Sequence, residues 1–197
     1  ALPISLRWIC LQSASREGRS ESMAEGSKVL KLCKTNQMAE RDGDGWVQCR
    51  CGSKHWGLHG AAGLLLVDIA EGSRRVLLQH RAPWVHNGDT WGIPGGARDS
   101  HESPLQAALR EANEEIGIEI TLVRSHGEHC DDHGDWRYDT IVATAPQEAL
   151  LFEHNHETVD LRWFFIEELG DLNLHPSFAK SWPIVSVLVA SIEGGGA

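Results

Sequence analysis

From residue 60 onward, hydrophobic and polar positions follow the patterns typical of strands and helices in an orderly succession. A continuous apolar run covers residues 61–69, AAGLLLVDI, and its length and flanks predict a buried strand. A Glu-Gly-Ser turn at residues 71–73 separates this run from RVLLQHR at residues 75–81, which predicts the partner strand of a hairpin. The main domain is therefore expected to begin with a β-hairpin.

The strongest helical pattern lies in residues 96–118, GARDSHESPLQAALREANEEIGI. Ser103 and Pro104 suit the N-cap and the first helical position, and Gly117 tolerates the left-handed conformation that ends many helices. Apolar residues recur at helical spacing and predict a buried stripe that consists of Leu105, Ala108, Leu109, Ala112 and Ile116. With this stripe facing inward, the glutamates of the helix should project together on another face.

The remainder of the chain predicts three more strands and one more helix. Residues 119–127 and 136–144 read as strands joined by an acidic, histidine-rich loop, and LRWFFI at residues 161–166 reads as another strand. A short helical turn up to residue 172 and a C-terminal helix at residues 183–192 follow. Strands in neighbouring and interrupted order, with one central and one terminal helix, predict an α/β (α+β) fold with a mixed β-sheet sandwiched between helices.

Composition limits the organisation and the class of partner. A chain of 197 residues with 41% hydrophobic content can form one ordinary domain with extensions, and no apolar run is long enough to span a bilayer. The formal charge of −10 argues against binding a nucleic acid polymer. Five scattered cysteines, an odd number, fit a reducing cytoplasm better than a disulfide scaffold.

We expect four segments along the chain. Residues 1–40 lack a sustained period and a convincing signal-peptide cleavage site, so they are expected to be a disordered leader or an extension of artificial origin. Residues 41–59 form a small segment that contains cysteine and histidine, residues 60–192 form the main domain, and residues 193–197 form a flexible tail.

The central helix carries an unusual acidic set, Glu111, Glu114 and Glu115. Like charges three and four residues apart repel each other, and here they also lie near the C-terminal end of the helix, where negative charge is unfavourable. A cluster that destabilises its own helix suggests that a positive group binds there. Oxygen ligands at this density suit a hard cation, Mg²⁺ or Mn²⁺.

The spacing of these residues resembles the signature motif of the Nudix hydrolase family. Gly96 is followed after five residues by Glu102 and after seven more by REANEEIGI at residues 110–118. The resemblance covers residues 60–192 and implies the Nudix fold and a metal-dependent pyrophosphohydrolase. The flanking sequences GDTWGIPGG and HETVDLRWFFIEEL look most like MutT-like enzymes, which convert a (d)NTP such as 8-oxo-dGTP to a monophosphate and pyrophosphate.

Two alternatives remain open at this point. One is a pyrophosphatase for ADP-ribose or another sugar nucleotide, and the other is a Nudix module that senses nucleotides or binds proteins without catalysis. In each case the partner is a small nucleotide, and the resemblance also allows a homodimer.

The resemblance also implies roles for individual residues. Arg110 is expected to hold a glutamate of the motif through a two-pronged hydrogen bond, and Glu102 to stabilise the turn before the helix. Glu157 takes the place of an acid outside the motif that binds metal or acts as base, although Glu148 and Glu153 lie close in sequence. The general base is either Glu111 or Glu157. The expected metal ligands are Gly96 through its carbonyl, Glu111, Glu114, Glu115 and Glu157.

Substrate contacts are predicted from residue type and position. Arg81, at the end of the second strand, is a candidate for phosphate binding, and surface exposure without function is an equally good interpretation. A nucleobase needs an aromatic or apolar wall. The candidates for that wall are Trp84, Trp91, Trp136 and Tyr138, each of which could instead pack in the core.

Residues 46–59, WVQCRCGSKHWGLH, offer soft metal ligands at short spacing. Cys49, Cys51 and His55, with His59 nearby, suggest structural Zn²⁺. The Cys-x-Cys spacing differs from the usual Cys-x-x-Cys, and half of a zinc-ribbon pattern is missing. The alternative is a compact hairpin with free thiols and buried tryptophans.

Overall fold

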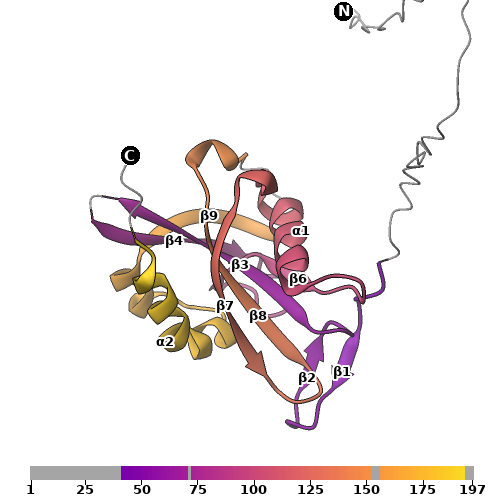
Figure 1. The fold of residues 1–197 in the computed structure, drawn as a ribbon. Coiled ribbons are helices and arrows are strands. Elements are labelled where there is room, and N and C mark those ends of the chain that lie inside the picture. The colour runs from indigo at the N-terminus through magenta and orange to yellow at the C-terminus, as the bar shows by residue number, and fades with distance from the viewer. Residues whose placement is uncertain (1–40, 71, 152–155, 194–197) are drawn as a thin grey trace, which may run out of the picture. The chain divides into compact units, whose positions relative to one another are not determined.

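The computed structural model describes residues 41–193, except residues 71 and 152–155 (Figure 1). The expectations for residues 1–40, for the end of the tail and for Glu153 lie outside the described residues.

The centre of the fold is a mixed sheet, which contains seven strands within the described part of the chain. β3 (Ala61–Ala70) pairs antiparallel with β4 (Ser73–Arg81) on one side and parallel with β8 (Arg137–Thr144) on the other. The predicted hairpin is therefore confirmed. Four more strands complete the sheet. β5 (Trp91–Gly92) and β9 (Thr158–Phe165) both pair with β4. β6 (Gly95–Ala97) pairs with the start of β3, and β7 (Arg124–Asp132) pairs with β8.

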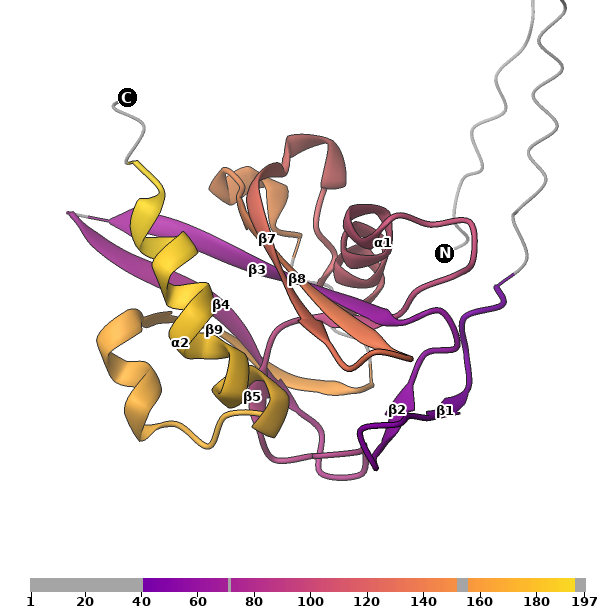
Figure 2. The same cartoon turned by 60° about the horizontal axis from the view of Figure 1, so that its bottom comes forward.

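Two helices cover opposite faces of this sheet, as the two views in Figures 1 and 2 show. Leu64 and Leu66 of β3 pack with α1 (Pro104–Ile116), whereas Leu65 and Val67 pack with α2 (Pro176–Ser191). Successive side chains of a strand point to opposite faces, so a continuous apolar run is required when both faces are covered. The predicted α+β sandwich is confirmed.

The ends of α1 follow directly from the sequence. The Ser103 hydroxyl accepts a hydrogen bond from the Gln106 backbone N–H at 3.3 Å, and the Gln106 side chain accepts one from the Ser103 N–H at 2.8 Å. This reciprocal capping box leaves fewer unpaired donors at the helix start. Gly117 ends the helix with φ at 62°, a conformation that glycine adopts without a steric penalty.

The predicted buried stripe of α1 is partly wrong. Ala108, Ala112 and Ile116 are fully buried, but Leu105 is 37% exposed and Leu109 is only partly buried. The buried face instead includes Ala107, Glu111 and Glu115. Small alanines let the helix approach β3 closely, and the glutamates become buried because they find hydrogen-bond donors at that contact.

Two element boundaries also differ from the prediction. The strand expected at residues 119–127 is β7, which starts at Arg124 after a 3₁₀ turn (Ile120–Leu122) and continues through most of the predicted acidic loop. Its ladder with β8, rather than an apolar pattern, holds these polar residues in a strand. The C-terminal helix begins at Pro176, not at residue 183, and Pro183 lies inside it on an exposed position, where water can reach the carbonyl that loses its partner.

Residues 41–59 form a hairpin of β1 (Trp46–Gln48) and β2 (Lys54–Trp56) that belongs to the same compact unit as the sheet. The Asp42 and Gly43 N–H groups donate to the buried Asp99 carboxylate at 2.9 and 2.7 Å. Trp46 and Trp56 are 52% and 42% exposed, so the expectation of buried tryptophans here is wrong. Among the described residues, neither α1 nor α2 nor a shorter helix has the length and apolar character needed to cross a membrane.

Candidate active site

Glu115 lies beneath the glycine-rich strand that precedes α1. Its carboxylate accepts hydrogen bonds from the Gly95 N–H at 2.9 Å and from the Gln79 amide at 3.1 Å, and the residue is only 7% exposed. Burial raises the pKa of Glu115 to about 7, because charge is poorly solvated there, while the Gly95 N–H opposes that shift. A buried carboxylate with a raised pKa is stabilised in its charged form by a nearby cation.

Glu111 lies one helical turn before Glu115 on the same face of α1, and it is close to Gly96. A Cβ atom at Gly96 would come within 2.7 Å of the Glu111 carboxyl group, so only glycine allows this approach. Arg110 Nη1 donates to Glu111 Oε1 at 2.5 Å. Burial raises the pKa of Glu111, and the charge of Arg110 partly offsets this effect.

Arg110 and Glu102 fix the turn before α1. Arg110 donates through Nε and Nη2 to the two oxygens of Glu102 at 2.6 and 2.9 Å, and Nη2 also donates to the Ala97 carbonyl at 2.9 Å. Glu102 Oε2 accepts the Asp99 N–H at 3.0 Å. Burial alone would raise the pKa of Glu102, but these hydrogen bonds lower it below its usual value. The geometry agrees with the two-pronged bond expected for Arg110 and with a structural role for Glu102.

Glu114 lies on the solvent side of the acidic set, with its side chain 45% exposed. Arg41 Nη1 approaches Glu114 Oε1 at 2.9 Å, while its other nitrogens approach Glu111 at 3.6 Å and Asp99 at 3.3 Å. One guanidinium group therefore faces three carboxylates. The position attracts positive charge, which is the property that a cation site requires.

A cavity of about 730 Å³ opens beside the acidic set. This volume is in the range of a small-molecule site, roughly 300–1,000 Å³. Gly96, Glu111, Glu115 and Glu157 all line it, whereas Glu114, the fifth predicted metal ligand, does not. Glu157 arrives from the segment before β9, where its backbone carbonyl accepts the Ala82 N–H at 2.8 Å. Its side chain is 44% exposed.

Arg81 also lines the cavity, at the end of β4. Its Nη2 donates to the His86 carbonyl at 3.2 Å, whereas its buried Nε has no hydrogen-bond partner within the described part of the chain. A buried donor without a partner is unfavourable, and an anionic ligand in the cavity is a natural acceptor for it.

Aromatic side chains line another part of the cavity: Trp46, Trp56, Trp136 and Tyr138. Trp46 and Trp56 meet edge-on with ring centroids 5.4 Å apart. The sequence predicted Trp136 and Tyr138 but missed the first two, because their hairpin was not expected to reach the site. Adjacent tryptophans on both strands of a short hairpin were the available signal.

Trp91 and Trp84 do not belong to the cavity lining. Trp91 stacks on His80 at 4.8 Å and packs edge-on against Phe164, which places it in the α2 side of the core. Trp84 is 71% exposed. Both were candidates from residue type alone, and the pairing of β5 with β4 places Trp91 against His80 instead of in the cavity lining.

His175 and Asn87 contribute a polar contact that the sequence did not reveal. Asn87 Nδ2 and His175 Nε2 lie 3.0 Å apart, and both residues line the cavity. Burial lowers the pKa of His175 to about 4, with a further contribution from the positive charge of Arg81. The imidazole is therefore neutral at physiological pH and adds no positive charge to the cavity.

Comparison with known proteins identifies the family. The NUDIX domain model matches residues 57–185, which is more than half of the chain. The chain belongs to the Nudix hydrolase family. Its fold, its acidic helix and its motif are those of a pyrophosphate-cleaving hydrolase, as the resemblance implied.

Several known proteins are similar to this chain. A Mycobacterium tuberculosis protein named "Putative 8-oxo-dGTP diphosphatase 3" is 46% identical over 164 residues, covering 80% of this chain and 75% of the relative. A Bifidobacterium longum nucleoside triphosphate pyrophosphatase/Nudix hydrolase fusion protein is 37% identical, covering 91% of this chain and 39% of the relative. The crystal structure of the Mycobacterium smegmatis Nudix hydrolase RenU matches with a TM-score of 0.72 and 42% identity, covering 79% of this chain and all of that one.

Proposed function

We propose that this Nudix hydrolase cleaves nucleoside triphosphates, with 8-oxo-dGTP as the leading substrate, into a monophosphate and pyrophosphate. The observation that carries the proposal is one cavity lined by the buried acids of the motif, Arg81 and a group of aromatic rings. The name of the Mycobacterium tuberculosis relative supports this choice of substrate.

The acidic set has the chemistry that a hard divalent cation requires, and its carboxylate oxygens would converge on the ion when it binds. Glu111, Glu114 and Glu115 with the Gly96 carbonyl would hold Mg²⁺ or Mn²⁺, because such ions prefer oxygen ligands and carboxylates. The raised pKa values of Glu111 and Glu115 support this interpretation, since a cation would relieve the burial of both charges. A bound divalent cation supplies neutralisation of phosphate charge and activation of water.

The protein's own residues position the substrate. Arg81 would bind the phosphate chain through its unpaired Nε, because guanidinium recognises phosphate oxygens in a planar geometry. Trp46, Trp56 and Trp136 would form the wall against which a purine stacks. The Asn87 amide offers a donor and an acceptor for the edge of the base.

We infer that Glu157 is the general base. The Glu111 carboxylate already accepts a hydrogen bond from Arg110 at 2.5 Å, which holds this group within the motif. Glu157 lines the same cavity and is accessible to water. It would accept a proton from the water molecule that attacks phosphorus.

The test of the proposed function is a release assay for phosphate and pyrophosphate. The panel contains dGTP, 8-oxo-dGTP, ADP-ribose, NADH and a dinucleoside polyphosphate, each with Mg²⁺, with Mn²⁺ and with chelator. We expect chelator-sensitive turnover of a triphosphate to its monophosphate, fastest for 8-oxo-dGTP. Turnover of ADP-ribose or NADH alone would overturn the proposed triphosphate substrate. Nucleotide binding without any turnover would overturn the proposal that this protein is a catalyst.

Glu157→Gln should lower kcat by about 10²-fold, because general-base catalysis contributes roughly 10²–10⁴-fold. The matched control is Glu148→Gln, an exposed acid nearby in sequence, which should retain wild-type kcat. The measurement is kcat as a function of Mg²⁺ concentration. A wild-type rate for Glu157→Gln, or a larger loss for Glu148→Gln, would assign the base elsewhere.

Homodimer formation and a cytoplasmic location stay predictions from the sequence.

A further inference from the structure

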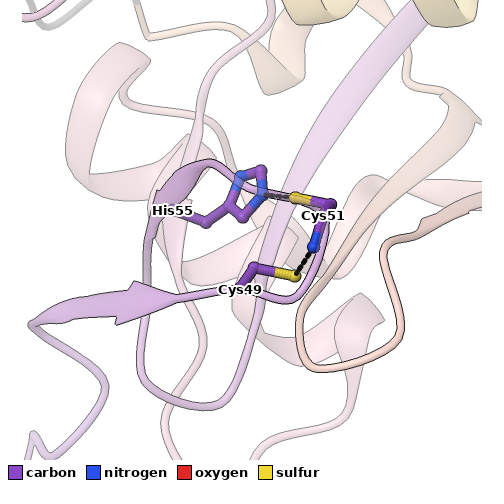
Figure 3. A group of neighbouring side chains, drawn as sticks. All are labelled: Cys49, Cys51 and His55. Atoms are coloured by element: carbon purple, nitrogen blue, oxygen red, sulfur yellow. Dashed lines mark hydrogen bonds between the residues drawn. The ribbon is translucent and has the colours of Figure 1, made fainter.

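The turn between β1 and β2 brings together two thiols and one imidazole, Cys49, Cys51 and His55 (Figure 3). One ligand atom from each residue lies within 4.8 Å of the other two. Cys51 Sγ and His55 Nε2 lie 3.1 Å apart. This Cys/His group is separate from the acidic set and takes no part in the proposed hydrolysis.

We propose that the Cys/His group binds Zn²⁺ through three protein ligands, with a solvent molecule in the fourth position. Thiolate sulfur and imidazole nitrogen are the usual zinc ligands, at about 2.3 and 2.0–2.1 Å from the metal. Tetrahedral ligands at these lengths lie about 3.5–3.8 Å from each other. The ligand atoms of the group lie within 4.8 Å of one another, which is close to that spacing.

The two thiols of the group have different surroundings. Cys49 is buried and its Sγ donates to the His133 carbonyl at 3.3 Å, whereas Cys51 is exposed. Metal binding would replace this contact of Cys49, because cysteine binds zinc as the thiolate.

Two further histidines are near the group, His133 in space and His59 in sequence, and both have other contacts. His133 lies beside His55 with ring centroids 4.6 Å apart, but its Nε2 faces Asp131 Oδ2 at 3.1 Å. His59 Nε2 faces Asp42 Oδ2 at 3.5 Å. Cys51 is exposed, so solvent can reach the remaining coordination position.

Zinc at this position would fix a wall of the cavity. His55 stacks on Trp136 with centroids 4.2 Å apart and planes 9° apart, and the Trp136 indole N–H donates to the Trp56 carbonyl at 3.1 Å. All three residues line the cavity. A short two-stranded hairpin is marginally stable alone, so a metal that joins its turn to β2 holds these rings in place.

The test is metal analysis of the full chain, purified without chelator and dialysed against Mg²⁺ to displace zinc from the acidic set. We expect about one Zn²⁺ per chain in the wild type, and at least tenfold less in Cys51→Ser and in His55→Asn. Cys130→Ser, a cysteine on β7, and Glu114→Gln should retain zinc and serve as matched controls. Cobalt added to zinc-free protein should give a thiolate charge-transfer band that is absent in Cys51→Ser.

A second variant separates loss of ligands from loss of fold. His55→Cys supplies another zinc ligand at the same position, so it should retain zinc and the thermal midpoint of the wild type. Chelator should lower that midpoint in the wild type and leave it unchanged in Cys51→Ser. A wild-type chain with no zinc and no cobalt–thiolate band, or zinc that stays in folded Cys51→Ser and disappears in Glu114→Gln, would overturn the proposal. Neither result depends on hydrolytic activity.

Discussion

Glu114→Gln should reduce kcat by about 10²-fold or more while the fold stays intact, because the change removes one negatively charged metal ligand. The side chain is 45% exposed and its contacts are to Arg41 and Arg110, so an uncharged amide of the same shape fits without burial of a new group. The measurement is kcat for 8-oxo-dGTP at increasing Mg²⁺, with circular dichroism to verify the fold. The concentration of Mg²⁺ at half-maximal rate should increase.

Glu128→Gln is the control for this experiment, because Glu128 is an exposed acid on β7 outside the cavity lining. It removes the same charge and should leave kcat and the Mg²⁺ dependence unchanged. Wild-type activity in Glu114→Gln would contradict the assignment of the acidic set as the metal site. An equal loss in both variants would instead indicate a general effect of net charge.

Ala112→Asp should destabilise the protein by about 3–5 kcal/mol, since it places an unpaired charge in the core and forces extra atoms into a closely packed contact. Ala112 is fully buried in the cluster that includes Leu64, Leu77 and Ile141. Such a loss is a large share of a typical stability of about 5–15 kcal/mol. Chemical denaturation should show a much lower midpoint or no folded baseline.

Leu105→Asp is the matched control on the same helix. Leu105 belongs to the stripe predicted from the sequence, yet it is 37% exposed in the first turn of α1, where negative charge is favourable. Its midpoint should stay close to that of the wild type. If Leu105→Asp unfolded the chain and Ala112→Asp did not, the face of α1 that carries Leu105 would be the one packed against the sheet.

Local patterns determined much of this protein. Ser103, Pro104 and Gly117 define the ends of α1 through interactions within a few residues, so sequence alone was sufficient to place them. The apolar runs of β3 and β4 predicted the central hairpin for the same reason. The spacing of the acidic motif indicated the Nudix family, which the match to residues 57–185 confirms.

Tertiary contacts decided the remaining features. Glu111 and Glu115 are buried where Arg110, the Gly95 N–H and the Gln79 amide donate hydrogen bonds to them. The donors from Gly95 and Gln79 lie outside the helix, so the helical pattern could not include them. β7 is polar and is held by its ladder to β8, so no apolar period marks it.

The composition of the cavity was also decided by distant parts of the chain. Trp46 and Trp56 reach it because the β1–β2 hairpin is tied to the sheet by the Asp99 carboxylate and by the Trp136 indole. Trp91, much nearer the motif in sequence, turns instead toward Phe164. Sequence specified the chemistry of the acidic helix, since that chemistry is local. The aromatic lining of the cavity, our proposed substrate wall, depends on contacts between segments 80 residues apart, such as Trp56 and Trp136.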